Sequence, residues 1–480
     1  YKILIIYHIN KQKIYKMSFY NKFLFFIILI NEAFSARNLK MIQMAIRHGA
    51  RYANNPQVIK DKPEYKFNKQ KRGQLTSVGM LQHYNLGNLM RQEYIVEKQL
   101  LSDKYEFDSV FAFSSNVNRT LQSLQSFLFG LYPLRTGLAI PDNLDADLQQ
   151  APYYQYVQQQ RQQKTGNFIY DNNLKFALPE GFYPYVIQQD TDNHSILQFI
   201  CKPSKAKLKA ESVKENTGKL EEFYKQFEKQ VQEIGAKVNI NYTLNVSNVS
   251  AFIDWVTSQR YLGITYNITL EEYKLLNYIK TLYKAIIYFT PLQTKLILTP
   301  YFRFLLKQFE SKINNQNTYK ITIASTHDTQ LQPLMAVFKL MSNECLLSYN
   351  LQQESETCQL MPIFASNFVF ELYEDDQDKQ HYVKVKFNGK YINICNGQDT
   401  CVYNDFKALL TEYIQEDYSS YCDDQCLPQD KQSIFWQISF WILLAIILII
   451  LVVYLYKIRN IFRKNSVQAE QIKIESNQQL

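Results

Sequence analysis

The sequence has few of the residues that bind metal ions. Its 480 residues include six histidines and seven cysteines, and no Cys-x-x-Cys pair occurs. Structural zinc sites usually draw their ligands from such closely spaced pairs of cysteines or histidines. We therefore expect no metal ion in this protein.

The body of the chain also lacks an excess of positive charge. The formal net charge is +9, but residues 1–16 hold four lysines and no acidic residue, and residues 457–480 carry a net charge of +3. Residues 37–456 are left with a net charge of +2. A nearly neutral body argues against a general polyanion binder, so we expect no nucleic-acid partner.

The N-terminal part has the pattern of a secretory signal. After Met17, Lys22 precedes an apolar run over residues 23–30, and small residues suited to cleavage follow. Eight apolar residues are too few to span a bilayer, which disfavours a membrane anchor here. We predict a signal peptide over residues 17–36. Residues 1–16 are then not part of the working protein.

Near the other end, residues 434–456 contain no charged side chain. At about 1.5 Å per residue this stretch would be about 35 Å long, enough to cross the hydrocarbon core of a bilayer. Tryptophans and tyrosines lie toward its ends, and basic residues follow at once. A buried helix of a soluble protein is the less favoured alternative. The pattern predicts a single-pass type I protein, with residues 37–433 lumenal or extracellular and residues 457–480 cytosolic.

The cysteines and glycosylation sequons fit that topology. All seven cysteines lie at or after Cys201, as in proteins of oxidising compartments, and their odd number leaves one thiol free or paired with another chain. Five sequons are candidate glycosylation sites: Asn193, Asn241, Asn245, Asn248 and Asn267. A sixth, at Asn118, lies in the predicted active site and is expected to be bare.

Strand, polar turn and helix follow one another three times along the chain. Residues 39–46, 107–113 and 319–324 have the character of strands, and apolar residues at helical spacing follow each turn. Two later segments, 368–373 and 382–387, predict an antiparallel hairpin. The pattern predicts an α/β fold with a central mixed sheet, helices on both faces and an active site beyond the strand ends.

The stretch from about 141 to 290 differs from the rest. Residues 154–163 are rich in glutamine, and residues 202–229 are highly charged, as in a solvated helix. We interpret the stretch as a mostly helical insertion that caps the edge of the sheet.

The first polar turn carries two arginines around a histidine, in Arg47-His48-Gly49-Ala50-Arg51. Each guanidinium offers a planar fork of donors that matches phosphate oxygens, and Gly49 allows the backbone to approach a ligand. Neighbouring cations favour the neutral form of His48, which can act as a nucleophile. Taken alone, the pentapeptide fits a solvated basic turn with a structural histidine equally well.

The other two turns add groups of the same kind. Arg119 lies at the start of a predicted helix, where free N–H groups and the helix dipole favour an anion. His327 can bind phosphate, and Asp328 beside it can protonate a leaving oxygen. A His-Asp pair by itself is more often an ordinary helix cap, but three such junctions are hard to attribute to chance.

Together these motifs resemble the histidine acid phosphatases, branch 2 of the histidine phosphatase superfamily, and especially its prostatic and lysosomal members. The first turn matches the family signature Arg-His-Gly-x-Arg-x-Pro, and the third matches its His-Asp-Thr. The second is similar to its Ser-Thr-Asp-Val-Asp-Arg-Thr-Leu segment. The similar segments, within a resemblance from about 39 to 426, are residues 47–51, 73–84, 114–121, 327–329 and 370–373.

The resemblance implies an acid phosphatase that hydrolyses phosphate monoesters through a phosphohistidine. His48 would be the nucleophile, and Asp328 would protonate the leaving alkoxide. The implied phosphate-binding residues are Arg47, Arg51, Arg119 and His327. The resemblance implies no cofactor.

Two alternative functions stay open. An inositol-polyphosphate (phytase-like) phosphatase of the same family would usually have a more basic cleft. A non-catalytic membrane receptor or adhesion protein on the same fold would not need Asp328. The sequence leaves open the natural substrate, the oligomeric state (a homodimer included) and the choice among lysosome, other vesicle and cell surface.

The chain departs from the family pattern at a few positions. Tyr52-Ala53 replaces Ser-Pro, Phe113 stands in place of an arginine, and Asn116 and Asn118 replace two aspartates. His83 matches a family histidine, and we interpret it as structural.

The resemblance also implies disulfide pairs. Cys395 and Cys401 follow the hairpin, where the family has a similar small loop, and are expected to bond to each other. Cys201 is expected to pair with Cys422 or Cys426.

Overall fold

The computed structural model describes residues 37–142, 176–191, 195–197, 202–264, 266–349, 351, 358–421 and, between 440 and 460, residues 440–445, 447–448, 451 and 453–460. The predicted signal peptide, Asn193 and the proposed pairing of Cys201 lie outside these residues, and the predicted membrane segment falls partly outside them. No helix among the described residues is long and apolar enough to cross a membrane. The chain divides into two compact units, the first ending at Tyr421 and the second beginning at Cys422.

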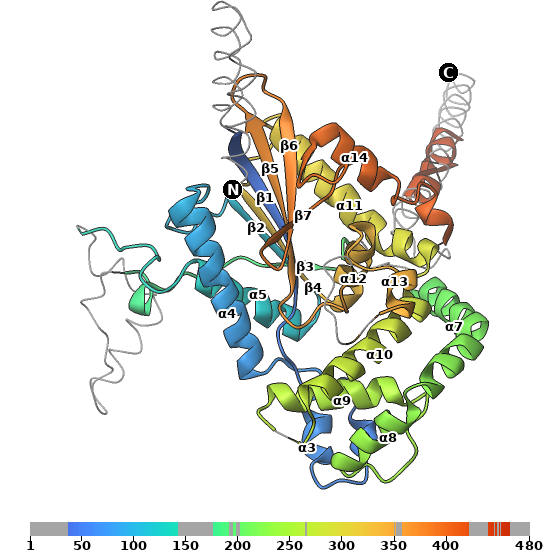
Figure 1. Cartoon of the computed structure of the whole chain (residues 1–480). Coiled ribbons are helices and arrows are strands. Elements are labelled where there is room, and N and C mark those ends of the chain that lie inside the picture. Colours follow the sequence, from blue (N-terminus) through green and yellow to red (C-terminus); the bar gives the residue numbers. More distant parts are fainter. Residues whose placement is uncertain are drawn as a thin grey trace, which may run out of the picture. The chain divides into compact units, whose positions relative to one another are not determined.

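One sheet organises the first unit (Figure 1), with the strand order β3-β2-β4-β1-β5-β6-β7 and β8 paired with β6. The strands are β1 Arg37–Arg47, β2 Val110–Ser115, β3 Gln188–Asp190, β4 Ile321–Thr326, β5 Asn367–Asp375, β6 His381–Phe387, β7 Lys390–Ile392 and β8 Thr400–Val402. Strands β1 to β4 pair in parallel, whereas β5 to β8 pair antiparallel. The predicted mixed sheet and the later hairpin are therefore confirmed.

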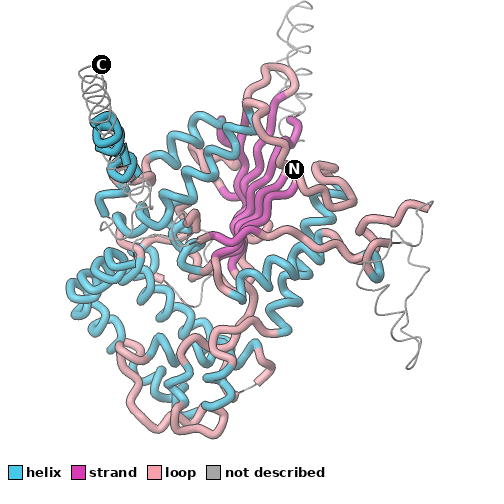
Figure 2. The backbone as a smooth tube through the Cα atoms, turned by 180° about the vertical axis from the view of Figure 1, so that it is seen from behind, coloured by secondary structure: helices cyan, strands magenta, loops and turns pink. Residues whose placement is uncertain are grey.

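Helices flank this sheet on both sides (Figures 1 and 2). The α-helices are α3 Tyr65–Gln70, α4 Ser77–Arg91, α5 Asn118–Leu131, α7 Lys202–Lys225, α8 Glu228–Lys237, α9 Val249–Tyr261, α10 Leu270–Tyr288, α11 Pro291–Ile313, α12 Asp328–Val337, α13 Asn343–Leu347 and α14 Tyr403–Thr411. A π-helix, η2 Gln92–Glu97, extends α4, and short 3-10 helices are η1 Pro56–Ile59, η4 Pro179–Gly181 and η5 Tyr418–Tyr421. Helices α4 and α5 cover one face, and α11, α12 and α14 cover the other.

Strand β1 shows why both faces need cover. Ile42 and Met44 point into the core beneath α4 and α5, while Met41 and Ala45 belong to the core on the other side. All of these side chains are buried. A strand buried on both faces is mostly apolar and alternates only loosely between apolar and polar residues.

Helices α4 and α5 pack in close backbone contact at two glycines. A Cβ atom on Gly87 would lie 2.0 Å from the carbonyl oxygen of Phe127, and one on Gly130 would lie 2.1 Å from that of Tyr84. No side chain fits at either position without moving a helix. The contact joins the second half of α4 to the last turns of α5.

The stretch from about 141 to 290 contributes a group of helices, α7 to α10, at one end of the first unit (Figure 1). Trp255 of α9 and Leu276 of α10 are buried in the same core cluster as the α11 face of the sheet. One short piece of the stretch, β3, joins the sheet instead, where it pairs with β2. This stretch thus contributes both to the edge of the sheet and to the helices beside it.

Two disulfides join described residues. Cys395–Cys401 is bonded as predicted. A second bond, Cys345–Cys358, links α13 to the segment before β5 and was not predicted, because 13 residues of sequence separation by itself carries no pairing signal.

Candidate active site

The three strands that precede the predicted site residues are neighbours in the sheet, in the order β2-β4-β1. They are parallel, so their carboxyl ends meet at one edge. Arg47 ends β1, Arg119 lies in the first turn of α5 after β2, and Asp328 begins α12 after β4. The fold therefore brings together, at one edge, segments that are far apart in the sequence.

Contacts among the six predicted residues connect these strand ends. Arg47 Nη2 lies 3.0 Å from Asp328 Oδ2, and Arg119 Nη2 lies 3.3 Å from His327 Nδ1. The rings of His48 and His327 are 5.4 Å apart, edge to face. Arg51 reaches the group through a shared neighbour, Phe364, whose ring lies 4.5 Å from the Arg47 guanidinium and 5.8 Å from that of Arg51.

His48 is held with one ring nitrogen available. Its Nδ1 lies 2.9 Å from the carbonyl oxygen of Gly49. Because a carbonyl oxygen only accepts hydrogen bonds, Nδ1 carries the proton and Nε2 keeps its lone pair. Burial holds the pKa of His48 well below its usual range, and the neighbouring His327 and Arg47 lower it further. The lowered pKa favours the neutral imidazole.

The loop around His48 is fixed by contacts from both neighbouring helices. The backbone N–H of Gly49 donates to Ser123 Oγ of α5 at 3.0 Å, and that of Ala50 donates to Gln82 Oε1 of α4 at 2.9 Å. A Cβ atom on Gly49 would lie 2.3 Å from the carbonyl oxygen of Gly79 in α4, so only glycine allows this approach.

His83 supports the same loop from α4. It is fully buried, and its Nε2 donates to the carbonyl oxygen of Arg47 at 3.0 Å. Burial lowers the pKa of His83 to about 4, so this ring too is neutral. These contacts fit its interpretation as a structural residue.

Arg51 is paired with a carboxylate that sequence reasoning missed. Its guanidinium makes two bonds to Asp254 of α9, at 2.9 and 3.1 Å. Lys280 of α10 and the backbone N–H of Asn54 also donate to Asp254, at 3.0 and 2.9 Å. Burial would raise the pKa of Asp254, but the cations Lys280 and Arg51 hold it well below its usual range. A single acid inside the apolar run Phe252-Ile253-Asp254-Trp255 was the available signal.

Asp328 has two cationic partners on one oxygen. Besides Arg47, Lys284 Nζ of α10 lies 2.8 Å from Asp328 Oδ2. Burial would raise the pKa of this carboxyl group, but Lys284 and Arg47 hold it well below its usual range. Lys284 was also missed, although Lys280 and Lys284 are spaced to share one face of α10.

His327 is neutral as well, and its orientation follows from its neighbours. The Arg119 guanidinium can only donate, so Nδ1 of His327 accepts and Nε2–H donates to Ser115 Oγ at 2.9 Å. Burial and the Arg119 charge lower the pKa of His327 to about 3. Burial and Arg51 lower the pKa of Arg119 to about 10, which still leaves it charged.

The residues that depart from the family pattern lie around this centre. The Phe113 ring is buried on the α11 side of the sheet, 5.0 Å from Phe304. Tyr52 packs edge to face against Phe67, at 5.9 Å. Asn116 and Asn118 are exposed.

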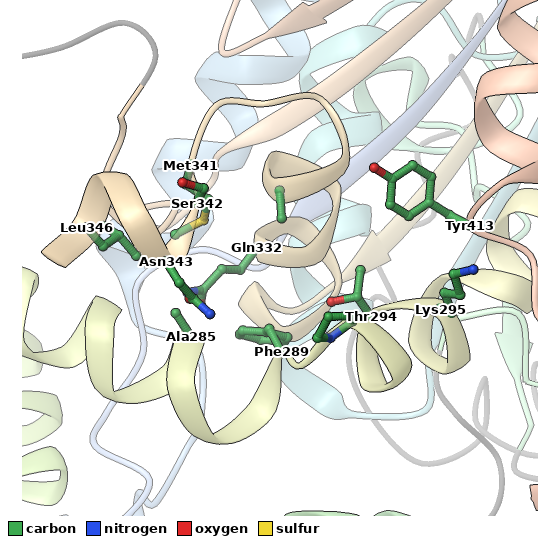
Figure 3. Close-up of a pocket in the computed structure, with 12 residues that line it drawn as sticks. Ala285, Phe289, Thr294, Lys295, Gln332, Met341, Ser342, Asn343, Leu346 and Tyr413 are labelled. Atoms are coloured by element: carbon green, nitrogen blue, oxygen red, sulfur yellow. The ribbon is translucent and has the colours of Figure 1, made fainter. Parts of the chain in front are cut away.

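A separate cavity of 330 Å³ lies among α10, α11, α12 and α13 (Figure 3). Most of its lining is apolar, including Ala285, Phe289 and Leu346, and Gln332 contributes an amide from α12. None of the six predicted site residues lines it. It is therefore distinct from the cluster around His48.

Known proteins resemble the chain in both sequence and fold. Residues 38–388 match the family described as the histidine phosphatase superfamily, branch 2. Lysosomal acid phosphatase of Rattus norvegicus is 35% identical over 108 residues, which cover 22% of this chain and 24% of the relative. Prostatic acid phosphatase of Homo sapiens is 32% identical over 117 residues, 23% of this chain and 28% of the relative. The chain thus spans only about a quarter of the length of these curated relatives.

Solved structures share the fold at low sequence identity. The phytase from Citrobacter braakii aligns with a TM-score of 0.53 and 14% identity, over 79% of this chain and 99% of that one. Hafnia alvei phytase in complex with tartrate aligns with a TM-score of 0.54 and 15% identity, over 80% and 98%. Because the family match covers most of the chain and both its strand-end motifs and its fold agree, the chain belongs to branch 2 of the histidine phosphatase superfamily.

Proposed function

We propose that the chain is an acid phosphatase that hydrolyses phosphate monoesters through a phosphohistidine at His48. The observation that carries the proposal is the state of His48: a buried, neutral imidazole with a free Nε2, among guanidinium groups from separate turns. A neutral nitrogen beside fixed cations suits attack on a phosphoryl group. The names of the similar acid phosphatases support the same activity.

The remaining predicted residues take complementary roles in this reaction. The substrate phosphate binds to Arg47, Arg51, Arg119 and His327. His48 Nε2 then bonds to phosphorus as the bond from phosphorus to the leaving oxygen breaks, and Asp328 gives that oxygen a proton. Water next attacks phosphorus, which breaks the nitrogen–phosphorus bond, releases inorganic phosphate and returns a proton to Asp328.

Asp328 must hold a proton to act in this way, whereas Lys284 and Arg47 stabilise its carboxylate. A bound phosphate draws cations to its own oxygens and repels a second negative charge, which raises the pKa of the carboxyl group. Acidic solution favours the same protonated form. The proposal therefore includes an acidic pH optimum.

A phytase-like activity is the second candidate. Lys280 and Lys284 add two cations to the arginine cluster, and a polyphosphate would use additional positive charge. The nearly neutral body favours simple monoesters instead.

A panel of phosphomonoesters that includes phytate tests these candidates. We expect glycerol phosphate and nitrophenyl phosphate to be hydrolysed in acidic solution with higher kcat/KM than phytate. A clear preference for phytate would establish the second candidate. Folded protein without activity on any member would support a receptor on this fold and contradict the proposal.

We also propose that the site faces the lumen or the cell exterior, anchored by residues 434–456. The side chains of Asn241, Asn245 and Asn267 are exposed, as glycan acceptors must be. We expect glycans at some of these positions and a C-terminal tail that protease reaches only from the cytosolic side of sealed vesicles. Asn118 should carry no glycan in active enzyme, because a glycan there would block access to Arg119. A tail protected in sealed vesicles, or a glycan on Asn118 of active enzyme, would contradict the assignment.

A further inference from the structure

Lys284 contacts the predicted proton donor from outside every motif of the site. It lies on α10, more than forty residues before Asp328, and its Nζ is 2.8 Å from Asp328 Oδ2. We propose that Lys284 is a positioning residue that confines the hydrolysis of alkyl phosphates to acidic solution. The proposal rests on the phosphatase function proposed above, and it assigns to the helical insertion a role in setting the pH range of the enzyme.

The pair is buried enough for the charge of Lys284 to matter. The exposed fractions of the side chains are 17% for Lys284 and 12% for Asp328. Two opposite charges at this distance interact more strongly here than at a surface, where water screens them. The carboxylate is therefore stabilised over the carboxylic acid that would serve as proton donor.

Lys284 differs from the other cation on Asp328. Arg47 belongs to the phosphate-binding turn and also donates to the carbonyl oxygen of Pro362, so its removal would disturb several functions at once. Among the described acidic side chains, Lys284 pairs with Asp328 alone. A substitution at Lys284 therefore changes the surroundings of the carboxyl group and leaves the three arginines in place.

The other charged and titratable groups around Asp328 come from four elements. They are Arg47, His48 and Arg51 at the end of β1, Arg119 of α5, Asp254 of α9, Lys280 of α10, and the adjacent His327. Both histidines are neutral, and Asp254 is matched by Arg51 and Lys280. Lys284 is thus the cation whose loss acts most directly on Asp328 without breaking another pair.

The direction of the effect follows from the role of the acid. A proton donor works only while protonated, so kcat/KM falls as the pH rises through its pKa in the free enzyme. A cation at this distance lowers the pKa of a carboxyl group, typically by about 1 unit or more. Removing Lys284 should raise that pKa and move the fall in activity to higher pH. The variant should gain activity on alkyl phosphates near neutrality.

The test compares two substrates in Lys284→Met across acidic to neutral pH. Glycerol phosphate expels an alkoxide that needs the proton, whereas nitrophenyl phosphate expels a phenolate that does not. The ratio of their kcat/KM values cancels any change in phosphate binding. We expect the alkaline fall of this ratio to move up by about 1 pH unit. At a fixed pH on that limb the ratio should rise several-fold, up to about tenfold.

Matched variants separate charge from structure. Lys284→Arg keeps the cation and should restore the wild-type profile, and Lys284→Gln should behave like Lys284→Met. Lys280→Met removes a buried lysine one turn earlier on α10 that bonds to Asp254 instead, and it should shift the ratio less. A cooperative thermal unfolding transition, measured independently of activity, reports that each variant is folded.

The outcomes of the two proposals can be told apart. An unchanged pH profile of the ratio in the Met and Gln variants, or an equal shift in Lys284→Arg, would overturn the role of Lys284. Loss of nitrophenyl phosphate hydrolysis in folded Lys284→Met and Lys284→Gln would also overturn the role of Lys284, because Lys284 would then be needed for every substrate. Wild-type protein inactive on both substrates would instead refute the phosphatase function.

Discussion

Replacing His48 by alanine is expected to abolish both turnover and the formation of a phosphorylated enzyme. The imidazole is the nucleophile of the proposed reaction, and its Nε2 is the nitrogen left free by the bond from Nδ1 to Gly49. Losing a nucleophile typically costs about 10⁴-fold or more in kcat. Labelled substrate, quenched in alkali, should leave phosphate on the wild-type protein and none on His48→Ala.

The same substitution at another histidine serves as the control. His381 lies on β6 and pairs loosely with Glu374, at 3.7 Å. His381→Ala should keep both the label and near wild-type turnover. If His48→Ala hydrolyses phosphate monoesters at the wild-type rate, the proposed mechanism is wrong.

Asp328→Asn is expected to slow alkyl phosphates far more than nitrophenyl phosphate. The substitution removes the proton donor, which matters most when the leaving oxygen is strongly basic. It also removes the anionic partner of Arg47 and Lys284, so both substrates should lose some activity. The difference between them is therefore the informative quantity, and it should be about 10²-fold or more.

The measurement is kcat for both leaving groups in Asp328→Asn and His48→Ala. Loss of the nucleophile should stop both substrates alike, whereas loss of the proton donor should separate them. Asparagine keeps a hydrogen-bonding side chain at the start of α12, which favours a folded variant. Equal losses in Asp328→Asn would mean that Asp328 orients phosphate and that the proton comes from another group.

Much of the candidate site could be predicted because its residues lie at the ends of local strand–turn–helix units. Strand and helix periodicity is readable over a few residues, and each turn between them displays its side chains at one edge of a parallel sheet. Arg47, Arg119 and His327 were found in this way. The Cys395–Cys401 bond was expected from the resemblance, because the family has a similar small loop after the hairpin, and the bond is present.

The carboxylate and the lysine that complete the site could not be found by the same reasoning. Asp254 and Lys284 lie on helices of the insertion, and a single charged residue on a helix is most often solvated. Their contacts depend on how α9 and α10 pack against the strand ends. The sequence shows that these helices form, but it does not show which of their faces meets Arg51 or Asp328.

The sequence by itself therefore determined the α/β pattern and the positions of charged residues on three turns, since each depends on residues close together in the chain, and the family resemblance added one local disulfide. Only the tertiary structure decided the strand order β2-β4-β1, the bond between Cys345 and Cys358, and the pairing of Arg51 with Asp254. These contacts join segments separated along the chain, and the close packing of helices against the sheet selects them.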